Sequence, residues 1–330
     1  MTSFQSMLLI LILLVLLPLS VTAGELPEVR VAALKFGTVN WELDVIRRHQ
    51  LDKKHGFHLA VQELISPSAI AVSVQAGASD VMVTDWLWVF KQQQNGRYFR
   101  YFPYSTAVGE LVGPCDLANQ GIDGLGGKVL GVAGGSEDKN WLLYRAYTRD
   151  VLGYDLADRV TVRFAAPPLL NALADTGKID AVLNYWHYSI VLKAKGFCSL
   201  LTLRDVLQHV ALTESVPMLG WVFKREWGVK NSALANAFLA ASYEAKQLLL
   251  TSDLEWDVLR PRMHVADQQL FEEMRAGYRQ GIPRQFSDPE IAAIEKIYTI
   301  VAGSTVSSVN AWENKVPEDV FWRQYNLGRQ

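Results

Sequence analysis

Strand and helix signals alternate along the chain from Val29 onward, and this alternation constrains the fold more than any other feature of the sequence. Short apolar runs such as Val29 to Leu34 are typical of strands, and each is followed by a loop and a segment with helical spacing of apolar residues. Such β–α alternation predicts parallel sheets with helices on both faces. The predicted strands are 29–34, 58–65, 80–84, 98–104, 128–133, 159–165, 179–184 and 217–223. They suggest two similar α/β lobes, and the last strand is expected to return to the first of them.

A second alternating block begins near Gly109, and the segment from Lys128 to Leu143 contains its first strand. It predicts a buried strand, a tight turn at Gly134 and Gly135, and a helix over 136–152 with Ser136 as its N-cap. Glycines without a Cβ let the backbone approach a ligand, and the unpaired N–H groups of a helix N-terminus suit an anion. The alternative is an ordinary strand-to-helix turn.

The composition allows one large or two medium globular domains. The chain has 330 residues, of which 50% are hydrophobic, with 32 basic and 34 acidic side chains. The formal charge of −2 gives no basic excess of the kind that nucleic-acid binding needs, so no nucleic-acid partner is expected.

The first 23 residues have the pattern of a secretory signal peptide. An apolar run from Met7 to Leu17 precedes small residues that end at Ala23, although the segment before the run has no Lys or Arg. A membrane-spanning helix needs about 20 apolar residues, and this run is shorter. We therefore expect cleavage after Ala23 and a soluble, exported mature protein.

The two cysteines, Cys115 and Cys198, allow one disulfide in an exported protein, and two free thiols are the alternative. No metal-binding pattern includes them. His55 and His58 lie three residues apart without a second ligand pair, and we interpret them as part of a solvated loop.

Three short motifs resemble a known family. They are a small-residue unit ending in Gly-x-x-Asp-Val at 73–81, a Leu-x-Gly-Lys unit at 125–132, and a unit at 167–181 that begins with Pro and ends in Gly-Lys-Ile-Asp-Ala. In this order and spacing the chain resembles periplasmic solute-binding proteins of ABC importers, in the nitrate/sulfonate/taurine group related to thiamine-precursor proteins. The resemblance covers roughly residues 29 to 225.

The resemblance implies a two-lobed periplasmic-binding-protein type II fold with two hinge strands and a ligand clamped between the lobes. It implies lobe 1 from 24–110 and 208–330, lobe 2 from 111–207, and hinges near 109–112 and 202–212. A monomer in the periplasm, which needs no cofactor and hands its ligand to an ABC permease and ATPase, is the expected protein.

In parallel sheets, ligands bind at the carboxyl ends of the strands. Aromatic side chains in the loops there favour a flat ligand, and lysines favour an acidic group on it. For the tryptophans the alternative is core packing, and for Lys35 and Lys139 it is a solvated surface. The expected ligand contacts are Lys35, Phe36, Asn40, Trp41, Ser66, Thr84, Asp85, Trp86, Gly134, Gly135, Ser136, Lys139, Asn184, Tyr185 and Trp186.

The expected ligand is a small anion, with pyrroloquinoline quinone, a flat tricarboxylate, as the first candidate. A sulfonate such as taurine and a thiamine pyrimidine are alternatives. Another alternative is a periplasmic protein that delivers its ligand to a dehydrogenase or sensor. An enzyme similar to pyrimidine synthases is disfavoured, because the sequence has no Gly-x-Ser-x-Gly elbow and no Walker motif: Lys128 is followed by Val129.

Overall fold

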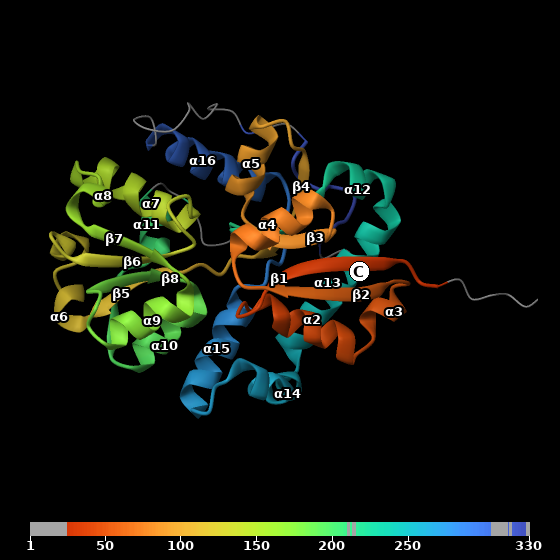
Figure 1. Ribbon diagram of the computed structural model, residues 1–330, viewed down its shortest axis with the longest axis horizontal. Coiled ribbons are helices and arrows are strands. Elements are labelled where there is room, and N and C mark those ends of the chain that lie inside the picture. The colour runs from red at the N-terminus through yellow and green to blue at the C-terminus, as the bar shows by residue number, and fades with distance from the viewer. Residues whose placement is uncertain (1–24, 210–211, 213–215, 305–315, 317–318, 328–330) are drawn as a thin grey trace, which may run out of the picture.

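The computed structural model describes residues 25–209, 212, 216–304, 316 and 319–327. Two five-stranded sheets lie side by side, and helices flank each of them (Figure 1). Each sheet with its helices forms one lobe, so the predicted two-lobed α/β fold is confirmed. The predicted leader lies outside the described residues. Among the helices that are described, none is long and apolar enough to cross a membrane.

The first lobe is built on a sheet with the strand order β2-β1-β3-β10-β4. Strand β1 pairs in parallel with β2 and β3, whereas β10 runs antiparallel to β3 and β4. The central strands are buried almost throughout, as expected for a sheet with helices on both faces. The strands are β1 (Glu28–Leu34), β2 (His58–Leu64), β3 (Val81–Thr84), β4 (Phe99–Ser105) and β10 (Leu219–Lys224).

The second lobe repeats this arrangement with the order β7-β6-β8-β5-β9. Strand β6 is parallel to β7 and β8, and β5 is antiparallel to β8 and β9. The chain passes from β4 to β5 and later from β9 to β10, so the antiparallel fourth strand of each sheet enters from the other lobe. The strands are β5 (Glu110–Pro114), β6 (Val129–Ala133), β7 (Thr161–Ala165), β8 (Ala181–Asn184) and β9 (Phe197–Leu201).

Most helices begin where the sequence has a residue that favours a helix start. The side chains of Ser66 and Asp85 accept backbone N–H groups of the first turns that follow, and Pro67 and Pro167 occupy first-turn positions. Helices of the first half are α2 (Val39–Arg48), α3 (Leu51–Lys54), α4 (Pro67–Ala76), α5 (Trp86–Gln94), α6 (Cys115–Ala118), α7 (Lys139–Tyr147), α8 (Leu156–Arg159) and α9 (Pro167–Asp175).

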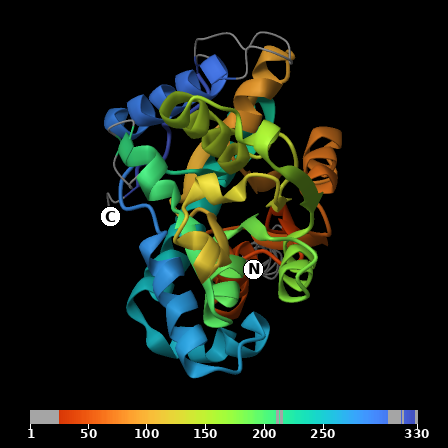
Figure 2. The same ribbon diagram turned by 90° about the vertical axis from the view of Figure 1, so that its left-hand side faces the viewer.

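The remaining helices lie mainly in the C-terminal third, drawn in cyan and blue along one side of the molecule (Figure 2). They are α10 (Trp186–Ala194), α11 (Leu203–His209), α12 (Arg225–Lys230), α13 (Ser232–Thr251), α14 (Asp253–Met263), α15 (Gln268–Gln280) and α16 (Asp288–Ser304). Two short turns, η1 (Ile122–Leu125) and η2 (Thr148–Leu152), complete the second lobe.

The start of α7 corrects the prediction that Ser136 caps a helix over 136–152. The helix begins at Lys139, and its N-cap is Asp138, whose carboxylate accepts the N–H groups of Asn140 and Trp141. Gly134 and Gly135 have φ values of 87° and 101°, so the turn runs further than a Ser136 cap allows. The first-turn N–H groups that were expected to hold an anion are thus occupied by a carboxylate of the chain itself.

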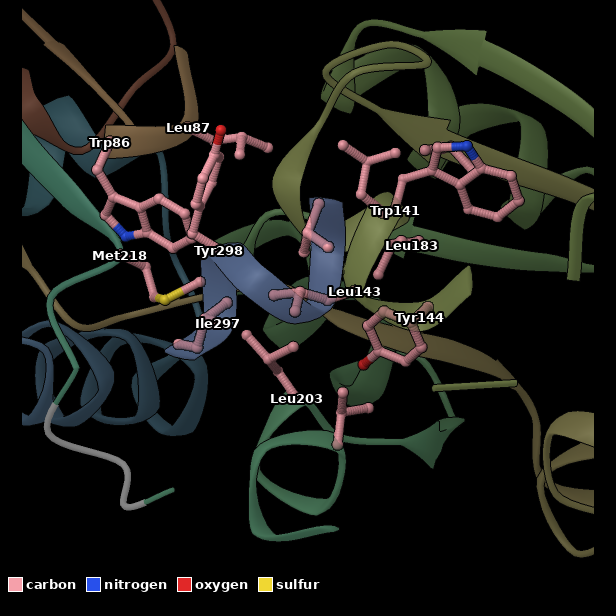
Figure 3. Packing of buried hydrophobic residues seen from close by; sticks show 14 of the residues in the cluster. Trp86, Leu87, Trp141, Leu143, Tyr144, Leu183, Leu203, Met218, Ile297 and Tyr298 are labelled. Atoms are coloured by element: carbon pink, nitrogen blue, oxygen red, sulfur yellow. The ribbon is translucent and has the colours of Figure 1, made fainter. Parts of the chain in front are cut away.

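A buried apolar cluster joins the two lobes (Figure 3). Trp86 and Tyr298 lie on its first-lobe side, Leu143 and Tyr144 of α7 lie on its second-lobe side, and Ile297 of α16 lies between them. Helix α16 therefore packs on both lobes, and this cluster fixes one side of the molecule where the lobes meet.

Candidate functional site

The loops at the carboxyl ends of β1 and β3 face those at the carboxyl ends of β6 and β8. Their side chains meet across the boundary between the lobes. Trp41 of α2 and Trp186 of α10 stand edge to face, with ring centroids 6.2 Å apart. At the rim, Lys91 of α5 forms an ion pair with Glu137, which precedes α7. Four separate strand-to-helix loops therefore contribute to one interlobe site, as the chain order predicts for a ligand cleft.

One side of this interlobe site is aromatic and encloses a small cavity. Its lining includes Thr38 and Tyr104 of the first lobe, Tyr278 of α15, and Trp186 of the second lobe. The cavity measures about 10 Å³, which is room for one water molecule at most. The hydroxyl of Tyr104 is buried, and the side chains of Thr38 and Tyr278 are its polar neighbours.

A buried polar network lies directly beneath this aromatic side. Glu42 of α2 forms an ion pair with Lys246 of α13 and accepts a hydrogen bond from Tyr278, with an O–O distance of 3.1 Å. The Lys246 ammonium stands 3.7 Å from the ring centroid of Tyr104. Burial lowers the pKa of Lys246, and the Glu42 carboxylate opposes that shift. The network therefore neutralises its own charge and fixes the rings of Tyr104 and Tyr278.

The other side of the site carries carboxylates. Asp85 caps α5 and accepts the N–H of Trp88 at 2.8 Å, and Asp138 caps α7. Burial raises the pKa of Asp138; the Lys139 ammonium lowers it, whereas the Asp85 carboxylate of the opposite lobe raises it further. Lys139 is only 5% exposed, and its ammonium forms no hydrogen bond or ion pair with any described residue.

His187 adds neutral ring nitrogens between the two sides. Its ring centroid lies 6.4 Å from that of Trp41 and 6.5 Å from that of Tyr185. Both ring nitrogens are buried, and the backbone of Phe36 is a polar neighbour of the ring. Burial lowers the pKa of His187 to about 4, so the ring is neutral at pH 7.

Several predicted contact residues shape the loops through their own hydrogen bonds. The Asn40 amide donates to the carbonyls of Leu34 and Lys35, and the Asn184 amide donates to the Pro167 carbonyl at 3.1 Å. The Ser66 hydroxyl caps α4. These three polar side chains hold the loop conformations, and only Asn40 keeps a buried oxygen without a partner within the described residues.

The other predicted residues fall into three groups by their surroundings. Trp86 is fully buried in the interlobe cluster, with its ring 5.7 Å from that of Phe90. Lys35, Gly134 and Ser136 are exposed to solvent. The half-buried residues of the loops, which remain open to a ligand, are Phe36, Thr84, Asp85, Gly135, Tyr185 and Trp186.

Four residues of the interlobe site were not predicted from the sequence as ligand contacts: Tyr104, His187, Lys246 and Tyr278. They lie on β4, α10, α13 and α15, and only His187 adjoins a predicted contact, Trp186. The other three carry no local motif, and they reach the site through packing between elements distant in the chain.

The disulfide lies away from this site. Cys115 at the start of α6 is bonded to Cys198 in β9, with a Cα–Cα distance of 4.9 Å, so the bond ties the edge of the second sheet to the helix that follows β5. Within the described residues, no three His, Cys, Asp or Glu side chains gather as a metal site.

Solved structures with the same architecture are binding components of import systems. The alkanesulfonate-binding protein SsuA of Xanthomonas axonopodis, bound to MOPS, is 16% identical, with a TM-score of 0.71, and the match covers 91% of this chain and 99% of that chain. The chain has the fold of periplasmic solute-binding proteins. The aliphatic sulphonate-binding protein SsuA of Escherichia coli matches with 15% identity and a TM-score of 0.66, over 89% of this chain and 98% of that one.

The nitrate-binding protein NrtA of Synechocystis also shares this solute-binding fold, with 12% identity and a TM-score of 0.59, over 87% of this chain and 84% of that chain. The resemblance to the nitrate and sulfonate group is therefore confirmed at the level of the fold. No protein-family model and no curated protein sequence matches the chain.

Proposed function

We propose that the protein is a periplasmic solute-binding protein that holds a small organic ligand between its lobes and delivers it to an ABC permease and ATPase. The observation that carries this proposal is a pair of buried amide oxygens, one in a strand-to-helix loop region of each lobe, that have no hydrogen-bond partner among the described residues. Asn40 contributes one from the first lobe, and Asn140 contributes the other from the second. Buried polar groups are normally hydrogen-bonded, so a pair left open, one in each lobe, favours a ligand there.

The lobe boundaries are part of this proposal. We propose 24–110 and 208–330 as the first lobe and 111–207 as the second, with the passages after β4 and after β9 as hinges. The contact between Trp41 and Trp186 then belongs to the closed form, because it joins the two lobes on the side away from the α16 cluster. Opening would separate these rings and admit the ligand.

The ligand has an aromatic or apolar part in this proposal. The half-buried rings of Phe36, Tyr185 and Trp186 supply apolar surface, and the buried ring of Trp41 packs behind Trp186. Pyrroloquinoline quinone fits the aromatic walls, but its three carboxylates would face Asp85 and Asp138, and among the described residues Lys139 is the one buried cation beside them. The sulfonates and nitrate named for the proteins of similar fold meet the same opposition.

The test is a thermal-shift screen of the mature chain from Gly24, stripped of ligand by unfolding and refolding. The panel is pyrroloquinoline quinone, alkanesulfonates, nitrate, pyrimidines and organic amines. A ligand at a hundred times its Kd adds about 2.7 kcal/mol to stability, which is readily measured. We expect one class to raise the melting temperature of the native protein and to raise that of Trp186→Ala much less. If no compound shifts either protein, the binding proposal fails.

A further inference from the structure

Two helix-cap carboxylates lie near the lobe boundary, where Lys91 of α5 forms an ion pair with Glu137, the residue before Asp138. Asp85 belongs to the first lobe and Asp138 to the second, and each uses its Oδ1 to accept backbone N–H groups, from Trp88 at 2.8 Å and from Asn140 at 2.9 Å. The Oδ2 atoms accept no hydrogen bond from any described residue. Each carboxylate therefore has a lone oxygen available to a ligand while its cap remains intact.

The neighbouring cations neutralise only part of the negative charge of Asp85 and Asp138. Lys139 is the neighbouring cation on α7, and it partly offsets Asp138. Lys91 on α5 is paired with Glu137 at the rim, and so adds no net charge. Two carboxylates and one ammonium therefore line this part of the site. Both carboxylates also raise the pKa of the Tyr185 hydroxyl, after the larger effect of burial, which places that ring beside them.

A second observation points to the same kind of ligand. The amide oxygens of Asn40 and Asn140, on side chains 5% and 3% exposed, are buried without a hydrogen-bond partner in the described residues. Asn140 stands in the same first turn of α7 that Asp138 caps, and Asn40 stands in the first turn of α2. These atoms accept hydrogen bonds and donate none. A ligand group that satisfies them must be a donor.

We propose that the cleft ligand carries a positively charged amine, and that this nitrogen binds between Asp85 and Asp138 when the lobes close. This inference rests on the proposed function and narrows its ligand class. An ammonium has donors only, so it matches the open carboxylate oxygens and removes the repulsion between the lobes. The ring of Tyr185, which lies beside both carboxylates, favours a cation next to an apolar body. An anion would increase the unbalanced negative charge instead.

The experiment compares compounds that share a body and differ in charge. Tyramine, N-acetyltyramine and 4-hydroxyphenylacetate form one set, and hexylamine, N-hexylacetamide and hexanoate form another. Each is titrated into the ligand-stripped mature protein by calorimetry at pH 7, and melting temperatures are recorded in parallel. We expect an amine to bind at least tenfold more tightly than its amide and its acid. Tighter binding of the acids than of the amines overturns the inference and leaves the binding proposal standing.

Charge-removing variants locate the amine. Asp85→Asn and Asp138→Asn keep the helix caps, because Asn is as good a cap as Asp. Each should weaken amine binding at least tenfold and leave the amide within twofold. Asp267→Asn is the matched control, because Asp267 caps α15 by accepting the Leu270 N–H at 2.7 Å. Equal amine affinity in all three variants overturns the inference. If none of the six compounds binds and the wider panel shows no ligand, the proposed function itself fails.

Discussion

Gly277 on α15 offers a test of lobe closure that leaves the cleft residues unchanged. A Cβ at this position would stand 2.8 Å from Trp186 Cζ3 and 3.3 Å from Ile190 Cδ1, both on α10 of the opposite lobe. We therefore expect Gly277→Ala to obstruct closure. The open form has no such contact, so the change should affect it only through helix propensity.

The expected loss of ligand affinity in Gly277→Ala follows from two opposing contributions to the free energy. Alanine is about 1 kcal/mol more favourable than glycine inside a helix, and this gain applies to both forms. Overpacking a filled site costs about 1–3 kcal/mol, and here the cost falls on the closed form alone. Since 1.4 kcal/mol is a factor of ten, ligand affinity should fall by roughly 5- to 150-fold. Gly303→Ala on α16 is the control, because a Cβ there meets no atom within 4 Å.

The assay is calorimetric titration of the ligand found in the screen, with thermal unfolding of each unliganded variant. Gly303→Ala should bind like the native protein. If Gly277→Ala also binds with native affinity, α10 and α15 do not approach each other on ligand binding, which contradicts closure between these two helices.

Four further predictions concern stability. Reducing the bond between Cys115 and Cys198, which closes a sequence separation of 83 residues, should cost about 4 kcal/mol in urea unfolding, and an unchanged midpoint would contradict this. Asp138 has a raised pKa, so its stabilising contribution is lost as the pH rises, and Asp138→Asn should raise the melting temperature at pH 7. The pKa of Asp155 is shifted in the other direction: burial alone would raise it, but its arginine partners lower it to about 2. Asp155→Asn should therefore reduce the free energy of unfolding by about 2 kcal/mol at pH 7 and by little below pH 2. His187 has a pKa lowered by burial to about 4, so melting temperatures should fall as the pH drops from 6.5 toward 4, and less so in His187→Phe. A flat profile in the native protein would contradict the burial of this ring.

The sequence predicted the elements of the fold because their signals are local. The eight predicted strands all occur within two residues of their expected bounds, since each is an apolar run closed by turn residues. Strands β5 and β9 were not predicted, because they are short and their pairing depends on a crossing from the other lobe. Ser136 has the composition of a cap, but the two glycines with positive φ move the helix start to Lys139.

The site could be predicted only in part, and Trp86 and Trp186 illustrate why. Both occupy the first helical position after a strand end, so the local sequence pattern predicts both of them equally as ligand contacts. Tyr298 of α16, more than two hundred residues away in the chain, packs in the same buried cluster as Trp86, so Trp86 is a core residue. Trp186 instead contacts Trp41 of the other lobe. Lys246 and Tyr278 reach the site through packing of α13 and α15, which no local motif records.

Hydrogen exchange with and without the ligand is the decisive measurement of whether one ligand contacts both lobes at the strand ends. We expect the ligand to slow amide exchange in four segments together, 35–41 and 84–88 of the first lobe and 134–141 and 184–188 of the second. Protection confined to one lobe, or centred on the surface pocket around Arg30 and Trp227 on the first lobe, would contradict it.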